Sequence, residues 1–251
     1  MVLIKLKCAP EDLQATINVR MTANKPQLSL SSLKAPGCNP VLEIIIHLRC
    51  TSSTQPSRAI TIFTPETIFN ASHDPDDGHM DNLARGMLGG GLTCTSNPKK
   101  RISFGYFKIH RVSQENANAA DLRDRPGANF LTVPALNSGK EVTVKYSLTE
   151  ERIFVFADGM SADDLVVGEK YSIGLNDGYV GATWWCWGDL DEELRDKKMH
   201  AFAKDTIGLW HGDEPNVSAL EDEGWVVGEK RAQLEFIINK GDGSCDVEIV
   251  E

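Results

Sequence analysis

The sequence contains no long run of apolar residues. None of its 251 residues belongs to a stretch that approaches the ~20 apolar residues of a membrane-spanning helix. Lys5 and Lys7 also interrupt the apolar N-terminal segment, which therefore lacks the hydrophobic region of a secretory signal peptide. From these two absences we expect a cytoplasmic protein that does not interact with membranes.

Motifs of metal, redox and nucleophilic chemistry are also missing. The six cysteines form no C-x-x-C pair, so neither a zinc ribbon nor a thioredoxin motif is expected. No G-x-S-x-G sequence indicates a hydrolase nucleophile, and the glycine-rich segment 86–92 is not followed by the Lys-Ser/Thr of a phosphate-binding loop. We expect no cofactor, and whether the protein is an enzyme stays open.

Basic residues are scarce relative to acidic ones. The formal net charge is −10, which argues against nucleic acid as a partner. The imbalance lies in the second half, because residues 1–125 carry 15 Lys and Arg against 11 Asp and Glu, whereas residues 126–251 carry 11 against 25. This asymmetry either forms a solvated acidic face or favours a basic protein partner or self-association into a homo-oligomer.

Patterns typical of β-strands dominate what the sequence does contain. Alternating or β-branched runs occur over residues 15–21, 27–33, 41–49, 59–63 and 102–112, and again over 141–148, 171–175 and 231–238. Each run is short and bounded by Pro, Gly, Asn or Ser, as strands are. We therefore predict a mainly β fold, an antiparallel β-sandwich with long loops over 70–98 and 113–129.

The pentapeptide V-V-G-E-K occurs twice, at Val166–Lys170 and at Val226–Lys230, and a strand pattern follows each copy. Glycine commonly supplies the turn conformation that precedes a strand. We predict that the two copies form equivalent turn–strand corners of the sandwich.

One short helix and one domain are expected. Asp189 and Glu192 are spaced as in a capping box, and Lys197 and Lys198 near the other end suit the helix dipole, so a helix is predicted over 189–202. The preferred organisation is a single elaborated domain over 1–251. The alternative is two lobes divided near 113–129.

Four segments in sequence order resemble a known group of proteins. They are Phe130–Val133, Gly139 with the strand after it, Leu165-x-x-Gly168-Glu169-Lys170-Tyr171, and Trp184-Trp185-x-Trp187-Gly188. Together they resemble a set of small intracellular fungal proteins with an immunoglobulin-like β-sandwich and no assigned function. The resemblance covers roughly residues 28–190. It implies an immunoglobulin-like fold and a fungal origin, and it implies no activity.

The segment from His73 to Asp81 is rich in metal-ligating residue types, with two histidines and four aspartates. These side chains are ligands for Zn, Mn or Ca. Their spacing matches neither an EF-hand loop nor the HExxH zinc pattern. A solvated acidic loop is the simpler interpretation, and the alternative is a metal site formed by His73, Asp77, His79 and Asp81.

Three tryptophans and a cysteine fall within G-A-T-W-W-C-W-G-D, residues 181–189. In a strand, Trp185 and Trp187 share one face, and Trp184 and Cys186 share the other. One face would then be core, and the other could place Trp184 in an aromatic groove near Trp210. The candidate ligand-binding residues are therefore Trp184, Trp185, Trp187 and Trp210.

Two functions are compatible with these features. The preferred one is a non-catalytic binding or interaction protein that holds a small molecule or a protein partner in an aromatic groove or at a sheet edge. The alternative is an enzyme of specialised metabolism, an isomerase, cyclase or hydrolase, with a pocket lined by the tryptophans. A closed apolar cavity containing His or Asp would favour the enzyme, and a flat tryptophan patch would favour binding.

Overall fold

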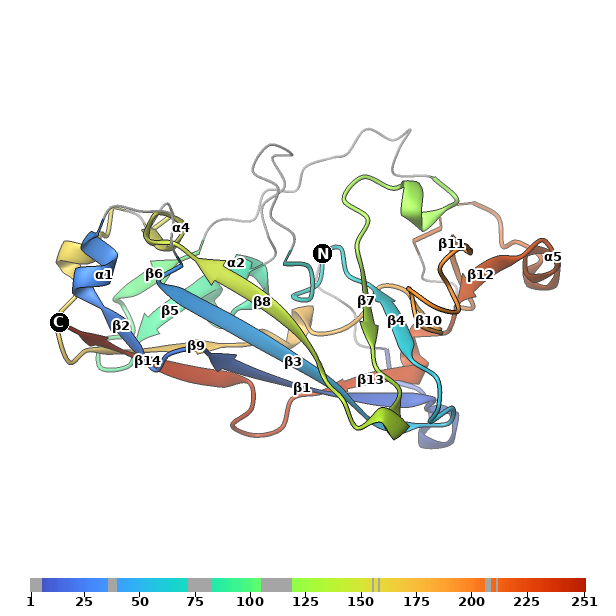
Figure 1. Cartoon of the computed structure of the whole chain (residues 1–251), viewed down its shortest axis with the longest axis horizontal. Helices are drawn as coiled ribbons and strands as arrows, with labels where there is room; N and C mark the ends of the chain where they lie inside the picture. The colour runs from blue at the N-terminus through green and yellow to red at the C-terminus, as the bar shows by residue number, and fades with distance from the viewer. Residues whose placement is uncertain are drawn as a thin grey trace.

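The structure is a computed structural model that describes residues 6–35, 40–71, 83–104, 119–154, 156–157, 159–205, 209–210 and 212–251. Within these residues the strands form sheets of four, five, three and two strands, called A, B, C and D below (Figure 1). The prediction of a mainly β fold is confirmed.

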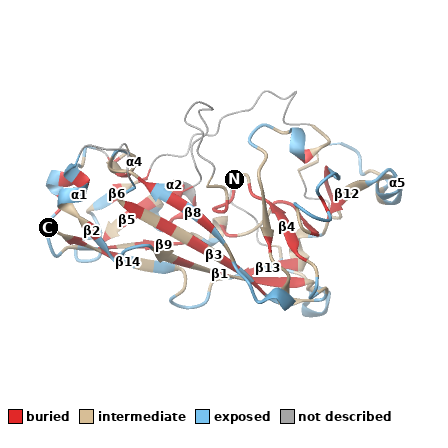
Figure 2. Cartoon of the chain, in the orientation of Figure 1, coloured by how far each residue is buried: buried red, intermediate tan, exposed pale blue. Residues whose placement is uncertain are grey.

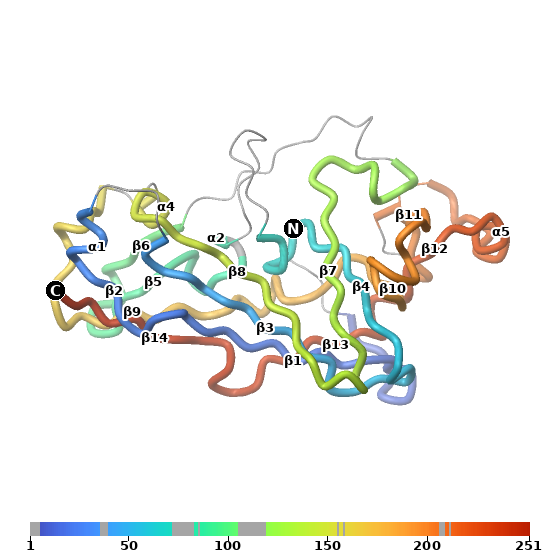
Figure 3. Tube along the Cα trace, viewed as in Figure 1, coloured from blue at the N-terminus to red at the C-terminus, as the bar shows by residue number. Residues whose placement is uncertain are grey.

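Sheet A has the strand order β13-β1-β3-β8. Its members are β13 (Leu234–Ile237), β1 (Ala15–Ala23), β3 (Leu42–Ser53) and β8 (Val142–Leu148). β3 is antiparallel to both neighbours, whereas β13 runs parallel to β1. The parallel pair places a strand from the first tenth of the chain beside a strand from its last tenth (Figure 3).

Sheet B has the order β2-β14-β9-β5-β6. It consists of β2 (Gln27–Ser29), β14 (Ser244–Val250), β9 (Lys170–Gly174), β5 (Gly91–Cys94) and β6 (Arg101–Ser103). β2 is parallel to β14, and the other pairs are antiparallel. β6 corresponds to the start of the strand predicted over 102–112. Residues 105–118, which include most of the rest of that prediction, lie outside the described part of the chain.

Sheets A and B bury their inward side chains in one apolar cluster, called the main core (Figure 2). Strand alternation explains the packing, because Ile44, Ile46 and Leu48 of β3 are buried while the residues between them are only partly covered. Ile173 of β9 and Val247 of β14 meet them from sheet B. A core of this size accounts for most of the folding free energy.

Sheets C and D lie at the opposite end of the molecule from the C-terminus (Figure 1). Sheet C has the order β10-β4-β7, with β10 (Trp185–Trp187), β4 (Ile60–Phe63) and β7 (Phe130–Val133), all antiparallel. Sheet D pairs β11 (Lys198–Ala203) parallel to β12 (Trp225–Gly228). A second, smaller apolar cluster, the second core, lies here and includes Phe63, Leu122, Trp184, Cys186, Leu194 and Met199.

The helices of the described residues are short. The α-helices are α1 (Leu30–Lys34), α2 (Leu83–Gly86), α4 (Glu150–Phe154) and α5 (Val217–Asp222). The 3-10 turns are Pro10–Asp12, Leu88–Gly90, Leu122–Asp124, Leu136–Ser138, Ala162–Asp164, Asp177–Tyr179 and Arg231–Gln233. No helix in this part of the chain has the length and apolar character needed to cross a membrane.

The helix predicted over 189–202 is wrong. Residues 190–196 form turns, and β11 follows from Lys198. The Asp189 carboxylate accepts a hydrogen bond from the Asp191 amide at 2.8 Å, so it caps a turn instead of a helix. Met199 and Ala201 alternate into the second core, and this burial outweighs the helix-like placement of charges.

Two other predictions need correction. The strand predicted over 27–33 ends at Ser29, whose hydroxyl accepts a hydrogen bond from the Ser32 amide at 3.2 Å and caps α1. The pairings β1–β13, β2–β14 and β11–β12 are parallel, so the sheets are not purely antiparallel as predicted.

The organisation into one domain or two lobes stays a prediction. Sheets A, B and C each combine strands from both sides of residues 113–129.

Candidate functional site

The tryptophan strand β10 separates its side chains as the alternation predicted. Trp185 and Trp187 pack into the main core, with ring centroids 5.4 Å apart in an edge-to-face arrangement. Trp184 and Cys186 pack into the second core. The strand therefore joins the two apolar clusters, and protein atoms cover both of its faces.

The indoles of β10 have structural partners. Trp184 and Trp185 are 0% exposed, and Trp187 is 7% exposed. The Trp184 Nε1 donates to the carbonyl oxygens of His200 at 3.0 Å and Phe202 at 3.3 Å, and the Trp185 Nε1 donates to that of Lys230 at 3.1 Å. Backbone groups satisfy these polar atoms, so Trp184 and Trp185 present no surface to a ligand.

Trp210 differs from the other three candidates because it is only half-buried. Its ring contacts His200 at a centroid distance of 4.9 Å, and its Nε1 donates to the Asp213 carbonyl oxygen at 2.9 Å. Trp225, which the sequence pattern did not single out, also contacts His200, at a centroid distance of 5.3 Å. The four candidate tryptophans thus fall in two separate cores and do not line a single groove.

Two features with polar chemistry remain, the Cys186 thiol and the segment from His73 to Asp81. Burial raises the pKa of the Cys186 thiol well above its ordinary value, which keeps Cys186 protonated and structural. The metal-site candidates His73, Asp77, His79 and Asp81 lie outside the described residues. Among the residues that the structure does describe, no cluster of three or more His, Cys, Asp or Glu could hold a metal ion.

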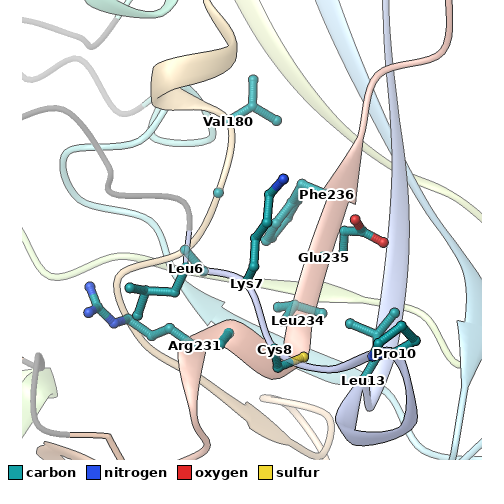
Figure 4. Close-up of a pocket in the computed structure, with 13 residues that line it drawn as sticks. Leu6, Lys7, Cys8, Pro10, Leu13, Val180, Arg231, Leu234, Glu235 and Phe236 are labelled. Atoms are coloured by element: carbon teal, nitrogen blue, oxygen red, sulfur yellow. The ribbon is translucent and has the colours of Figure 1, made fainter.

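A cavity of about 450 Å³ lies elsewhere, beside β13 (Figure 4). Three segments that are distant in sequence surround it: residues 6–13, residues 180–182 and residues 231–236. The Gln14 amide donates to the Gln233 carbonyl oxygen at 2.9 Å and holds the first segment against the third. Pro10, which has no amide hydrogen to lose, begins the 3-10 turn that redirects the chain into β1.

Apolar side chains form most of the cavity wall. The largest are Leu6, Leu13, Val180, Leu234 and Phe236. Leu234 and Phe236 face inward because they alternate along β13 with the exposed residues Glu235 and Ile237. None of the four candidate tryptophans lines this cavity.

Four side chains with polar or reactive groups also line the cavity: Lys7, Cys8, Arg231 and Glu235. The side chain of Arg231 is 13% exposed, and its Nε lies 3.3 Å from the Asp205 Oδ2, which also accepts the Arg231 amide at 2.9 Å. The Arg231 Nη2 and the Asp205 Oδ1 are buried without a hydrogen-bond partner. Both atoms have almost no accessible surface, so this ion pair offers no free donor to the cavity.

Sequence reasoning identified part of this site. The alternation of Leu234 and Phe236 was visible as a strand pattern over 231–238. The cavity itself was not, because it forms only where three distant segments converge, and none of them carries a recognisable motif.

No protein-family model, curated protein or solved structure matches this chain. The site is therefore interpreted from its own chemistry.

Proposed function

We propose that this protein binds a small, largely apolar molecule in the cavity beside β13. The cavity itself carries the proposal: its volume of about 450 Å³ lies within the range of small-molecule sites, and most of its lining residues have apolar side chains, beside three charged ones. This keeps the small-molecule binding expected from the sequence but moves it from the tryptophans to another place in the fold.

Binding fits the wall of the cavity better than a reaction does. A nucleophilic mechanism requires a base within hydrogen-bond reach of the nucleophile. Cys8 is the only nucleophilic thiol on the described wall, and no histidine lines the cavity beside it. Asp205, which lies beside Arg231 of the wall, is engaged by that residue.

We also propose that sheets A and B correspond to the immunoglobulin-like sandwich that the resemblance implies. The support is their shared main core and the alternating burial of β1, β3 and β8. A fungal origin and a cytoplasmic location belong to the same proposal.

The test is binding of neutral apolar molecules to the full chain. We expect octan-1-ol and its homologues to raise the unfolding temperature and to form complexes in native mass spectrometry. Ala232→Phe and, independently, Leu13→Trp fill the cavity and should abolish both effects. Ala219→Phe on the exposed face of α5 is the matched control and should leave them unchanged. Absence of binding to the wild-type protein would refute the proposal.

Cys8 provides a second readout, because it is a half-buried free thiol on the cavity wall. Bound ligand should slow its alkylation by iodoacetamide, measured by mass spectrometry of the intact chain and its peptides. Cys245, a half-buried thiol of β14, does not line the cavity, and its alkylation should not respond to the ligand. Equal protection of both thiols would place the ligand elsewhere.

A further inference from the structure

We propose that the preferred ligand is an amphipathic monoanion, an apolar molecule with one carboxylate, and that Lys7 recognises this carboxylate. The inference rests on the proposed binding function and adds the chemical class of the ligand. It follows from the balance of charges at the cavity.

Lys7 is the first cation of the site. It lies on the cavity wall and is exposed, and it has no ion-pair or hydrogen-bond partner among the described residues. In Figure 4 its side chain extends between Val180 and Phe236 and ends in the amine. An ammonium group at the rim of an apolar cavity can meet a ligand carboxylate while the ligand's apolar part contacts Leu234 and Phe236.

Arg231 is the second cation. Asp205 neutralises its charge but engages it only through Nε and the backbone amide, so Nη2 remains a buried donor without an acceptor. This donor has almost no accessible surface, so a ligand oxygen in the cavity does not reach it, and the recognition of a carboxylate falls to Lys7.

Among the described residues of the cavity wall, Glu235 is the one carboxylate. It is exposed between the buried Leu234 and Phe236, and Figure 4 shows its carboxylate turned away from Lys7. With Arg231 paired to Asp205, the unneutralised charge that faces a ligand is that of Lys7. A single positive charge matches a ligand with a single negative charge.

The experiment compares three probes of equal chain length: octanoate, octan-1-ol and octylamine. We expect octanoate to bind the full chain at least about tenfold more tightly than octan-1-ol, and octylamine to bind most weakly. Lys7→Gln should remove most of the preference for octanoate and leave the affinity for octan-1-ol unchanged. Lys99→Gln, at an exposed lysine between β5 and β6, is the control and should keep the preference.

The outcomes separate this inference from the proposed function. Equal affinity for octanoate and octan-1-ol, or a preference that persists in Lys7→Gln, would overturn the anionic ligand and leave the apolar cavity as a binding site. Failure of all three probes to bind would overturn both. A preference for octanoate that falls as salt is raised would support the role of Lys7, because salt screens exposed charges.

Discussion

The two copies of V-V-G-E-K have the same five residues and different structures. In the first copy, Val166–Lys170, Gly168 has φ of 87° within a turn, and Val166 and Val167 are 57% and 51% exposed. In the second copy, Val226–Lys230, residues 226–228 belong to β12, and Val227 is buried. The prediction that both copies form equivalent corners is wrong.

Their surroundings explain the difference. A Cβ at Gly168 would meet nothing within 4 Å, whereas a Cβ at Gly228 would lie 2.3 Å from the Trp184 Nε1. The Glu229 amide donates to the Trp185 carbonyl oxygen at 2.8 Å, so the second copy is held against the tryptophan strand. The same five residues form a turn where solvent surrounds them and an extended strand where they pack against β10. Tertiary context therefore overrides local preference at this pentapeptide.

The largest expected contrast lies at the two glycines. Gly228→Ala should destabilise the protein by about 3 kcal/mol, because the new methyl group would overlap the Trp184 indole. Gly168→Ala should cost about 1 kcal/mol, since its only penalty is the left-handed backbone conformation. Urea unfolding followed by tryptophan fluorescence measures both. Equal losses would show that the two copies have equivalent environments after all.

The middle valines should give a smaller contrast. Val227→Ala removes buried methyl groups and should cost about 2 kcal/mol. Val167→Ala changes an exposed side chain and should stay within about 0.5 kcal/mol of the wild type. Thermal unfolding of the two variants provides the comparison, and a loss of more than about 1 kcal/mol in Val167→Ala would mean that a partner covers this turn.

Strand alternation made part of the fold predictable from the sequence. β1, β3 and β8 occur close to where the pattern placed them, because each has one buried and one solvated face. The division of Trp185 and Trp187 from Trp184 and Cys186 was predictable for the same reason. Periodicity reports which residues share a face, and here it did so correctly.

Periodicity does not report what covers each face. An aromatic groove would have required the Trp184 face of β10 to be open. Leu122 and Met199, which are far apart in sequence, pack in the cluster on this face, so both faces of β10 are buried. The cavity depends on long-range convergence in the same way, since Leu6, Val180 and Phe236 come from three distant segments. Predicting either would have required the pairing of β1 with β13 and the position of β11.

The smallest expected contrast concerns the glutamate of each copy, Glu169 in the first and Glu229 in the second. The Glu169 carboxylate accepts hydrogen bonds from Lys100 at 2.6 Å and Tyr171 at 3.0 Å. Burial alone would raise the pKa of this carboxyl, but these bonds, the Val166 amide and the charge of Lys100 hold the pKa below its usual value. Glu229 of the second copy acts on the amine of Lys204. Burial alone would lower the pKa of Lys204, but the charges of Glu229 and Glu221 raise it above its usual value.

These opposite shifts predict opposite pH limits. A carboxyl whose pKa is lower in the folded state stabilises the protein above its unfolded pKa of about 4.3, and the effect is lost as pH falls through the folded pKa. Glu169→Gln should therefore be less stable than wild type by under about 1 kcal/mol at pH 7, and the difference should disappear on acidification. An amine with a raised pKa stabilises below its unfolded pKa of about 10.4, so the deficit of Lys204→Gln should hold from pH 6 to 9 and disappear as pH rises through the folded pKa. Unfolding free energies measured across pH would contradict this if the Glu169→Gln deficit failed to shrink on acidification, or if the Lys204→Gln deficit failed to shrink at high pH.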